Sequence, residues 1–462
     1  MSNITGAHES RTGDGVSVEP ARETSGSSSS TDTSRGAVVA WAFWDWGSAA
    51  FNAVLVTFIF AVYLTDSVGA TLPDGQNATS LYSGAVAIAG VAIALIAPVM
   101  GRRSDLRGTR RRSLRLWTLI TVVLMFLLFV VKNDSPEYFW IGVVVMAVAN
   151  VTFEFAEVNY FAQLSQISTR ETVGRVSGFG WSMGYFGGIV LLLVCYFGFV
   201  AGEGETRGFF NLPAEDGFNI RMVAVLAAVW FLLSALPAMF RVPEIAPVAA
   251  DGKQPKGVVE AYKDLIGQIK GLWNTNRTAT YFLLASAVFR DGLAGVFTFG
   301  AILAVTVYGL SAGDVLLFGV AANVVSALGA VAGGFLDDRI GPKPIILGSL
   351  GLMILSCLVL FFLDGATGFW VFGLVLCAFV GPAQSASRSF LTRLAGEGQE
   401  GQFFGLYTTT GRAVSWMAPA LFGLFVWFSG ADRAGILGIA LILLAGAVML
   451  AFVKPPVSEN NL

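Results

Sequence analysis

The sequence predicts an all-α membrane protein in which twelve transmembrane helices form two pseudo-symmetric bundles of six. Composition is the first observation: 55% of the 462 residues are hydrophobic and only 13% are charged, against roughly a quarter charged in a soluble domain. The second is a set of twelve apolar segments, each long enough to cross a bilayer as a helix. The third is a short motif that occurs once in each half of the chain. Together they exclude a soluble enzyme.

The twelve apolar segments are separated by short polar breaks or by breaks that contain Gly and Pro. They are continuously apolar and do not alternate, which favours helices over the strands of a barrel. The expected spans are 38–64, 80–101, 113–132, 138–163, 177–201, 220–241, 277–304, 313–335, 344–363, 369–391, 403–428 and 433–453. An even number of spans places both ends of the chain on one side of the membrane.

Composition divides the chain into five regions. Residues 1–36 are rich in Ser, Gly and Thr and are expected to be a disordered cytoplasmic tail, with residues 456–462 as a second short tail. Residues 37–241 and 277–455 are expected to form the two six-helix bundles. Between them, residues 242–276 carry apolar side chains at helical spacing. They indicate either an amphipathic helix on the membrane surface or a soluble connecting helix.

Lysine and arginine residues gather on one side of the predicted topology. With the N-terminus inside, the inner loops hold Arg102, Arg103, Arg107, Arg110, Arg111, Arg112, Arg115, Arg170, Arg175, Arg339, Lys343, Arg393 and Lys454, whereas the outer loops hold Lys132, Arg207, Arg221 and Arg433. The positive-inside rule therefore places both termini in the cytoplasm of a cell-membrane protein. Topology and anionic lipid headgroups account for the basic run after the second span, so the lipid bilayer is an expected partner and nucleic acid is not.

No catalytic, cofactor or metal site is expected. Gly180 to Gly184 match the G-x-S-x-G motif of serine hydrolases, but the sole histidine, His8, lies in the tail and cannot act as the base. The same two glycines and Gly188 recur every four residues, which predicts a small-residue face for close helix contact. The three cysteines share no short spacing, and the sequence has no phosphate-binding loop of the kind that holds ATP.

The loops after the second and eighth spans share the motif G-x-x-x-D-x-x-G-x-[RK]. The two copies are Gly101, Asp105, Gly108 and Arg110, and Gly334, Asp338, Gly341 and Lys343. The first glycine allows close approach to a neighbouring helix, and the second makes the turn. The aspartate is expected to pair with a basic side chain or to lie at the N-terminus of a neighbouring helix. Breaking such contacts would set the equilibrium between inward-open and outward-open states.

The twelve helices in two sets of six and the doubled loop motif resemble the major facilitator superfamily of secondary transporters. Four stretches resemble its branch of vacuolar amino-acid effluxers and their bacterial relatives: WAFWDWGSAAFN at 41–52, RVSGFGWSMGYFGG at 175–188, FRDG at 289–292, and ASRSFLTRL with GQFFGLY within 386–407. Trp44 stands where that branch typically has tyrosine, and Phe289 with Arg290 stand where it often has Tyr-Asn. The resemblance implies alternating access, with a site between the halves lined by the first, fourth, seventh and tenth helices.

Ionisable residues inside membrane helices are costly and usually face the interior, so they are the candidate site. The first span carries Asp45, with Asn52 two turns further on, and the fourth carries Glu154 and Glu157 on one face. Carboxylates that share a low-dielectric site cannot all stay ionised cheaply, so one of these three is expected to carry a proton. The alternative is that they pair with the arginines of the inner loops.

The second half supplies charge of both signs. Arg290 and Asp291 lie near the middle of the seventh span and Arg412 lies within the eleventh. Arg290 and Asp291 are adjacent, about 100° apart on the helix, and cannot face the same partner. Asp291 and Arg412 are expected to form an ion pair that is either opened by the substrate or permanent. Ser387 and Arg388 are expected to be inner-gate or loop contacts rather than substrate ligands.

An acidic first half that faces an arginine-bearing second half suits a zwitterion. Its ammonium would lie toward Asp45, Glu154 or Glu157, and its carboxylate would be held bidentately by Arg412 or Arg290. The expected function is therefore proton-coupled secondary transport of amino acids or similar small molecules by a monomer, with export favoured by the resemblance. Two alternatives stay open. One is a drug or metabolite antiporter with protons; the other is a non-transporting membrane partner or receptor, against which the lack of a sizeable soluble domain argues.

Overall fold

The computed structural model describes residues 35–244 and 276–454, except residues 75, 203, 311 and 397, together with residues 267, 271 and 273. The two expected tails, His8 and most of the expected linker helix lie outside the described residues. Within the described residues the chain is almost wholly helical, and twelve segments are long and apolar enough to cross a membrane. The predicted fold class is confirmed.

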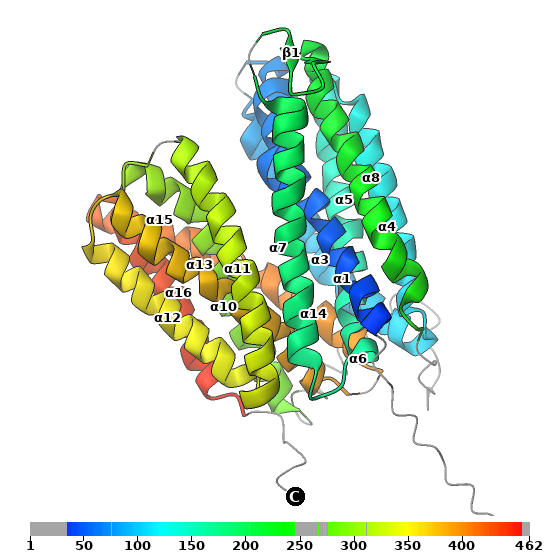
Figure 1. Ribbon diagram of the computed structural model, residues 1–462, viewed down its shortest axis with the longest axis vertical. Coiled ribbons are helices and arrows are strands. Elements are labelled where there is room, and N and C mark those ends of the chain that lie inside the picture. Colours follow the sequence, from blue (N-terminus) through cyan, green and yellow to red (C-terminus); the bar gives the residue numbers. More distant parts are fainter. Residues whose placement is uncertain are drawn as a thin grey trace, which may run out of the picture. The chain divides into compact units, whose positions relative to one another are not determined.

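The first six spans, called here the first half, contain short helical irregularities beside the main helices (Figure 1). The first span runs through α1 (Arg35–Ala49), η1 (Ala50–Phe58), α2 (Phe60–Tyr63), η2 (Leu64–Val68) and η3 (Gly69–Thr71). The others are α3 (Ala78–Arg107), α4 (Arg110–Leu127) with η4 (Leu128–Val130), α5 (Pro136–Ala162) with α6 (Leu164–Ile167), α7 (Val173–Cys195) with η5 (Tyr196–Val200), and η6 (Glu215–Gly217) with α8 (Phe218–Arg241).

The second half follows the same plan with longer uninterrupted helices. Its elements are α10 (Arg277–Thr306), α11 (Ala312–Ile340), α12 (Pro342–Phe362), α13 (Ala366–Leu394), α14 (Glu400–Val414), α15 (Met417–Ser429), η7 (Asp432–Ala434) and α16 (Gly435–Ala451). The halves meet where α7 lies beside α11 and where α3 lies beside α14 (Figure 1).

The eleventh span is broken, although the sequence predicted one continuous helix over 403–428. Helix α14 ends at Val414 and α15 begins at Met417. Pro419 lies in the first turn of α15, where it has no N–H to donate and its ring would clash with the carbonyl of Ser415 in a continuous helix. The break therefore has a local cause, and hydropathy does not register it.

Two helices run past their predicted ends at the motif loops. Helix α3 extends to Arg107 and α11 to Ile340, because hydropathy marks the end of the apolar layer and charged residues can continue a helix beyond it. Gly108 then ends α3 in the left-handed conformation (φ 60°), and Gly341 has φ 85° between α11 and α12. Both second glycines of the motif thus make the expected turn.

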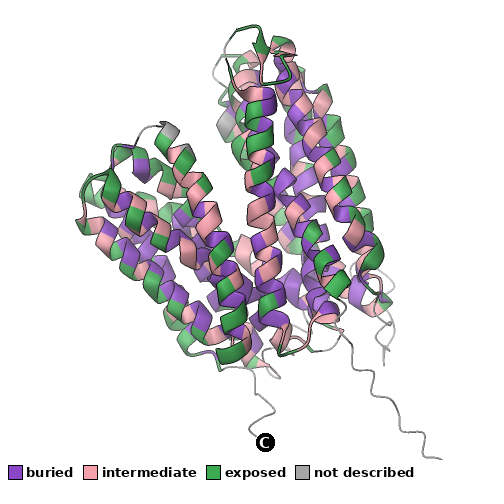
Figure 2. Cartoon of the chain, in the orientation of Figure 1, coloured by how far each residue is buried: buried purple, intermediate pink, exposed green. Residues whose placement is uncertain are grey.

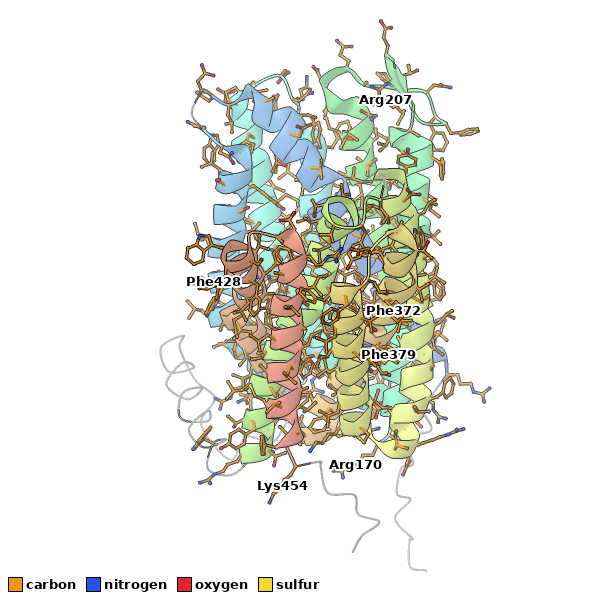
Figure 3. All side chains as sticks on the ribbon, turned by 90° about the vertical axis from the view of Figure 1, so that its left-hand side faces the viewer. Arg170, Arg207, Phe372, Phe379, Phe428 and Lys454 are labelled. Carbon is orange, nitrogen blue, oxygen red and sulfur yellow. The ribbon has the colours of Figure 1, made fainter. Side chains whose placement is uncertain are left out.

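Charged residues mark the two ends of the helices, and apolar side chains cover the layer between them. Figure 3 places Arg170 and Lys454 at one end and Arg207 at the other. We call the first the basic end, because both motif loops, with their arginine and lysine residues, also lie there. At the opposite end β1 (Thr206–Arg207) pairs antiparallel with β2 (Leu212–Pro213). Buried residues lie between the helices and exposed ones on their outer faces (Figure 2), as expected for helices surrounded by lipid.

Candidate functional site

At the basic end, Asp105 of α3 caps the N-terminus of α14 in the other half. Its Oδ1 accepts a hydrogen bond from the Gly401 amide (3.1 Å) and its Oδ2 one from the Gln402 amide (2.9 Å). Its Oδ1 also accepts from Arg110 Nε at 2.7 Å. Arg110 is 1% exposed and reaches Glu400 of α14 at 2.5 Å. Asp105 thus makes both contacts that the motif suggested, one with a basic side chain and one with a helix N-terminus.

The second copy of the motif repeats this arrangement in the opposite direction. Asp338 of α11 accepts hydrogen bonds from the Gly174 amide (2.8 Å) and the Arg175 amide (3.1 Å) at the start of α7. Arg393 of α13 lies 3.6 Å from Asp338 and 2.6 Å from Asp337, whose side chain is fully buried. Each half therefore places a carboxylate on the first turn of a helix of the other half.

The last residue of the second copy acts elsewhere. Lys343 donates to the carbonyls of Ala451 (2.8 Å) and Val453 (2.7 Å), at the end of α16 in its own half. Arg393 takes the place that Arg110 has in the first copy. The sequence identified Arg393 only as an inner-loop charge, because the motif does not extend to α13.

The first glycines of the two motif copies lie directly against backbone of the other half. A Cβ on Gly101 would overlap the carbonyl of Gly401, and a Cβ on Gly334 would lie 2.6 Å from the carbonyl oxygen of Gly174. Such contacts require glycine. Together with the two aspartate caps, they close the contact between the halves at the basic end.

A cavity of about 300 Å³ lies between the halves, lined by α5 and α7 from the first and by α10, α13 and α14 from the second. Its charged lining residues are three acids and three arginines: Glu154, Glu157, Asp291, Arg290, Arg388 and Arg412. Five of these six are residues that the sequence singled out as site candidates; Arg388 is the addition. Phe161, Trp181 and Tyr407 supply aromatic surface.

Arg412 pairs with Glu154 across the two halves, which corrects the expected pair of Arg412 with Asp291. Asp291 instead accepts a hydrogen bond from the Ala418 amide through Oδ2 at 2.6 Å. The break in the eleventh span explains the difference. It leaves the first amides of α15 without partners in their own helix, and a carboxylate on the neighbouring α10 satisfies one of them.

Asp45 pairs with Arg388 of α13, and not with the inner-loop arginines that were the alternative. Its Oδ2 lies 3.6 Å from Arg388 Nη1, which is an ion pair beyond hydrogen-bond distance. Arg388 is 1% exposed and donates to the hydroxyl and the carbonyl of Ser177 at 3.0 Å and 2.6 Å. Its guanidinium carbon lies 4.9 Å from the ring centre of Trp41 and 5.5 Å from that of Trp181. Arg388 is therefore both a contact between the halves and a cavity residue.

The sequence predicted Arg388 as an inner-gate or loop contact rather than a substrate ligand. The signal that could have found it was present, because Arg388 falls inside the apolar span 369–391 as Arg412 falls inside its own span. Asn52 has the opposite outcome: it is exposed in η1 and does not line the cavity.

Three charged cavity residues have no ion-pair partner among the described residues: Glu157, Arg290 and Asp291, of which Asp291 is held by the Ala418 amide. Among the described residues, Glu157 makes no hydrogen bond or ion pair; the charges acting on it are those of Glu154, Asp45, Arg290 and Arg412. Arg290 donates to the carbonyl of Tyr407 (3.2 Å) and lies over its ring at 3.7 Å, with no described carboxylate within ion-pair distance.

Twelve spans, two halves that exchange aspartate caps and a charged cavity between them define a transporter of the major facilitator superfamily type. Solved structures of that superfamily share the fold. FucP in its outward conformation matches with a TM-score of 0.68 at 16% identity, covering 91% of this chain and 98% of FucP. The proton:xylose symporter XylE matches with a TM-score of 0.67 at 15% identity, covering 91% and 95%.

The chain belongs to the family described as "Vacuole effluxer Atg22 like", which matches residues 161–461. An uncharacterized MFS-type transporter of Bacillus subtilis, YxiO, is 22% identical over 420 residues, 91% of this chain and 95% of that protein. Autophagy-related protein 22-2 of Aspergillus clavatus is 26% identical over 308 residues, 60% of this chain. The match covers 46% of that fungal relative, so the two are alike over about half of its length. The protein is thus a multi-pass membrane transporter and not an enzyme.

Proposed function

We propose that the protein is a proton-coupled secondary transporter of amino acids or similar small zwitterions that works by alternating access, with export as the favoured direction. The observation that carries the proposal is that the same cavity holds an acid with neither an ion pair nor a hydrogen bond among the described residues, Glu157, and an arginine without a carboxylate partner, Arg290. We further propose that it acts as a monomer in the cell membrane, with both termini in the cytoplasm, as the distribution of basic loops indicates.

The charge pattern of the cavity favours a zwitterion over a ligand of one sign. Glu154 with Arg412, and Asp45 with Arg388, already neutralise each other. Asp291 is held by the Ala418 amide, and a ligand ammonium beside Glu157 and a ligand carboxylate on the guanidinium of Arg290 would neutralise these two residues with charge-assisted hydrogen bonds. A lipophilic cation would satisfy Glu157 alone and leave an arginine without an anion in a low-dielectric site.

The dimensions of the cavity favour a small substrate. Its volume of about 300 Å³ lies at the lower end of the range for small-molecule pockets. The aromatic rings of Phe161, Trp181 and Tyr407 offer apolar surface to the side chain of an amino acid, while the charged groups hold the invariant ammonium and carboxylate. This division would let one site accept several amino acids.

The contacts at the basic end support alternating access. Asp105 and Asp338 hold helix N-termini of the opposite half, so a state open at this end must release both caps. When the caps are released, the backbone amides and the aspartate carboxylates become exposed. Water can then make the hydrogen bonds that these groups had made with each other. The two end states therefore differ by contacts that are individually modest, which suits a transporter that must exchange between them.

Proton coupling and direction are supported by the chemistry of the cavity and by the relatives. Three carboxylates face one cavity, and ionisable groups inside membrane helices commonly form proton pathways. Fold relatives include proteins described as a fucose:proton symporter and a proton:xylose symporter, and the family is described as an effluxer. An antiporter of anionic metabolites is the second candidate, because three arginines line the cavity.

Counterflow in proteoliposomes tests the proposal directly. Purified protein is reconstituted with an unlabelled amino acid inside, and uptake of labelled amino acids, amines and organic anions is measured with and without an imposed pH gradient. The proposal expects exchange of zwitterions and a gradient-dependent accumulation. Exchange of a lipophilic cation or of an anion without any zwitterion would overturn the substrate assignment, and accumulation that ignores the pH gradient would overturn proton coupling.

A further inference from the structure

Asp291 lies at the joint where the eleventh span is broken. Its Oδ2 accepts the hydrogen bond of the Ala418 amide at 2.6 Å, in the first turn of α15, and its side chain also lines the cavity. It is 8% exposed. A carboxylate at a helix N-terminus interacts favourably with the helix dipole, so the ionised form of Asp291 holds the start of α15 in place.

The joint separates two helices that belong to different packing partners. Helix α14 lies against α3 and α5 of the first half and also against α10 of its own half. Its N-terminus is capped by Asp105, and Arg412 near its end is bound to Glu154. Helix α15 lies against α10 and α16 of its own half. A movement of the halves changes the contacts of α14 with α3 and α5 but not those of α15, and the break between Val414 and Met417, beside Asp291, is where the two helices are able to bend relative to each other.

The surroundings of Asp291 differ from those of the other cavity carboxylates. Val288, Ala418 and Ile442 form a buried apolar cluster on this side of α10. Helices α15 and α16 contain no titratable residue. The charged groups that line the cavity on the other packed elements are Glu154 and Glu157 on α5, Arg388 on α13 and Arg412 on α14, with Arg290 on its own helix.

None of the three arginines forms an ion pair with Asp291. Arg412 is bound to Glu154 and Arg388 to Asp45, while Arg290 is turned toward Tyr407. Protonating Asp45 or Glu154 would leave a guanidinium without an anion, which is costly in a low-dielectric site. Glu157 has no arginine partner, but the proposed function needs it ionised to hold the ligand ammonium. Protonating Asp291 leaves no arginine without an anion, spares the ammonium site and removes a charge from apolar surroundings.

We propose that Asp291 carries the coupling proton and that its protonation loosens the joint between α14 and α15. The inference rests on the proposed proton-coupled transport and names the residue that performs it. A proton from the cavity binds the free oxygen, Oδ1, and the carboxylate becomes a neutral acid. The charge-assisted hydrogen bond to the Ala418 amide then becomes a weaker neutral one, so α14 can change its angle to α15 as it leaves α3.

The first test detects the proton itself and needs no substrate. Infrared difference spectra of the purified full-length protein are recorded during a pH titration, for the natural sequence and for Asp291→Asn. The amide oxygen of asparagine still accepts from the Ala418 amide, so the variant imitates the protonated state and should fold. We expect a carboxylic-acid carbonyl band that the variant lacks and that Asp432→Asn, an exposed acid in the same half, retains. A band unchanged in Asp291→Asn would overturn the proposal.

The second test measures coupling. A pH gradient of one unit supports about a tenfold accumulation for each coupled proton. We expect Asp291→Asn to accumulate the labelled zwitterion no better with the gradient than without it, and Asp291→Glu to restore the gradient-dependent accumulation. Full accumulation by Asp291→Asn would overturn the role of Asp291 and leave the proposed function standing. Transport by the natural sequence that ignores the gradient would overturn both.

Discussion

Glu154 on α5 and Arg412 on α14 form an ion pair that joins the two halves in the wall of the cavity. The side chain of Arg412 is 30% exposed, so the pair is accessible from the cavity, whereas Arg388, which pairs with Asp45, is only 2% exposed. Removing one partner leaves an uncompensated charge that water screens only in part. The pair therefore holds α14 against the first half without being inaccessible to a substrate.

A double-mutant cycle on this pair should show strong coupling. Glu154→Gln and Arg412→Gln each leave one charge unpaired, whereas the double variant leaves none. We expect each single variant to slow zwitterion exchange more than the double variant does, with an interaction energy of about 1 kcal/mol or more. The exchange rates of the four proteins in proteoliposomes give this value. The exposed pair of Asp364 and Arg433 is the matched control and should show little coupling. Additive losses in the Glu154 and Arg412 variants would contradict the prediction.

The proposed contacts of Glu157 and Arg290 with a zwitterion predict that each substitution affects one end of the ligand. Glu157→Gln should weaken binding of an amino acid roughly 10- to 100-fold, the value of a hydrogen bond to a charged group, and should leave an N-acetylated amino acid unaffected. Arg290→Lys should weaken binding of the amino acid because lysine lacks the planar fork, and should leave the amino-acid amide unaffected. Binding of the three ligands to each purified variant, measured by calorimetry, separates the two effects.

We expect the two variants to differ in opposite ways in their selectivity among the three ligands. If Glu157→Gln and Arg290→Lys weaken all three ligands equally, the residues support the cavity without contacting the ligand ends.

Hydropathy and the doubled motif predicted a large part of this architecture. The apolar segments located every span, because hydropathy reports the length of the membrane-crossing segment, and the motif located Asp105 and Asp338 at helix ends. Partners were harder to predict. The hydrogen bond of Asp291 to the Ala418 amide depends on the break before Pro419, and the pairs of Arg412 with Glu154 and of Arg388 with Asp45 depend on how the halves pack. Neither the direction of a side chain nor the packing of distant helices can be read from the spacing of residues along one chain.

The aspartate caps predict how the conformational equilibrium responds to their removal. Asp105→Ala and Asp338→Ala each remove a carboxylate from a helix N-terminus, and losing such a cap costs about 0.5–2 kcal/mol. Because the cost falls on the state closed at the basic end, the population open there should rise by a factor of roughly 2 to 30. Spin labels on cysteines at Arg170 and Lys454, which are exposed and lie in different halves, report the change as a longer distance.

The control for the caps is Glu171→Gln, which alters an exposed acid just before α7 and should leave the distance distribution unchanged. An unchanged distribution in both cap variants would show that other contacts hold the basic end closed.

The close contact of Gly101 predicts a larger shift toward the state open at the basic end than removal of an aspartate cap does. A Cβ on Gly101 would overlap the carbonyl of Gly401, and because the obstacle is backbone it cannot move aside as a side chain would. Gly101→Ala should therefore disfavour the closed basic end by about 1–3 kcal/mol, the usual cost of overpacking. The same labelled distance should lengthen, and exchange should slow because the protein reaches the closed state less often. The control is Gly84→Ala on the same helix. No atom lies within 4 Å of its added Cβ, so this variant should behave as the natural sequence does. If Gly101→Ala cannot be distinguished from Gly84→Ala, the close contact is not required.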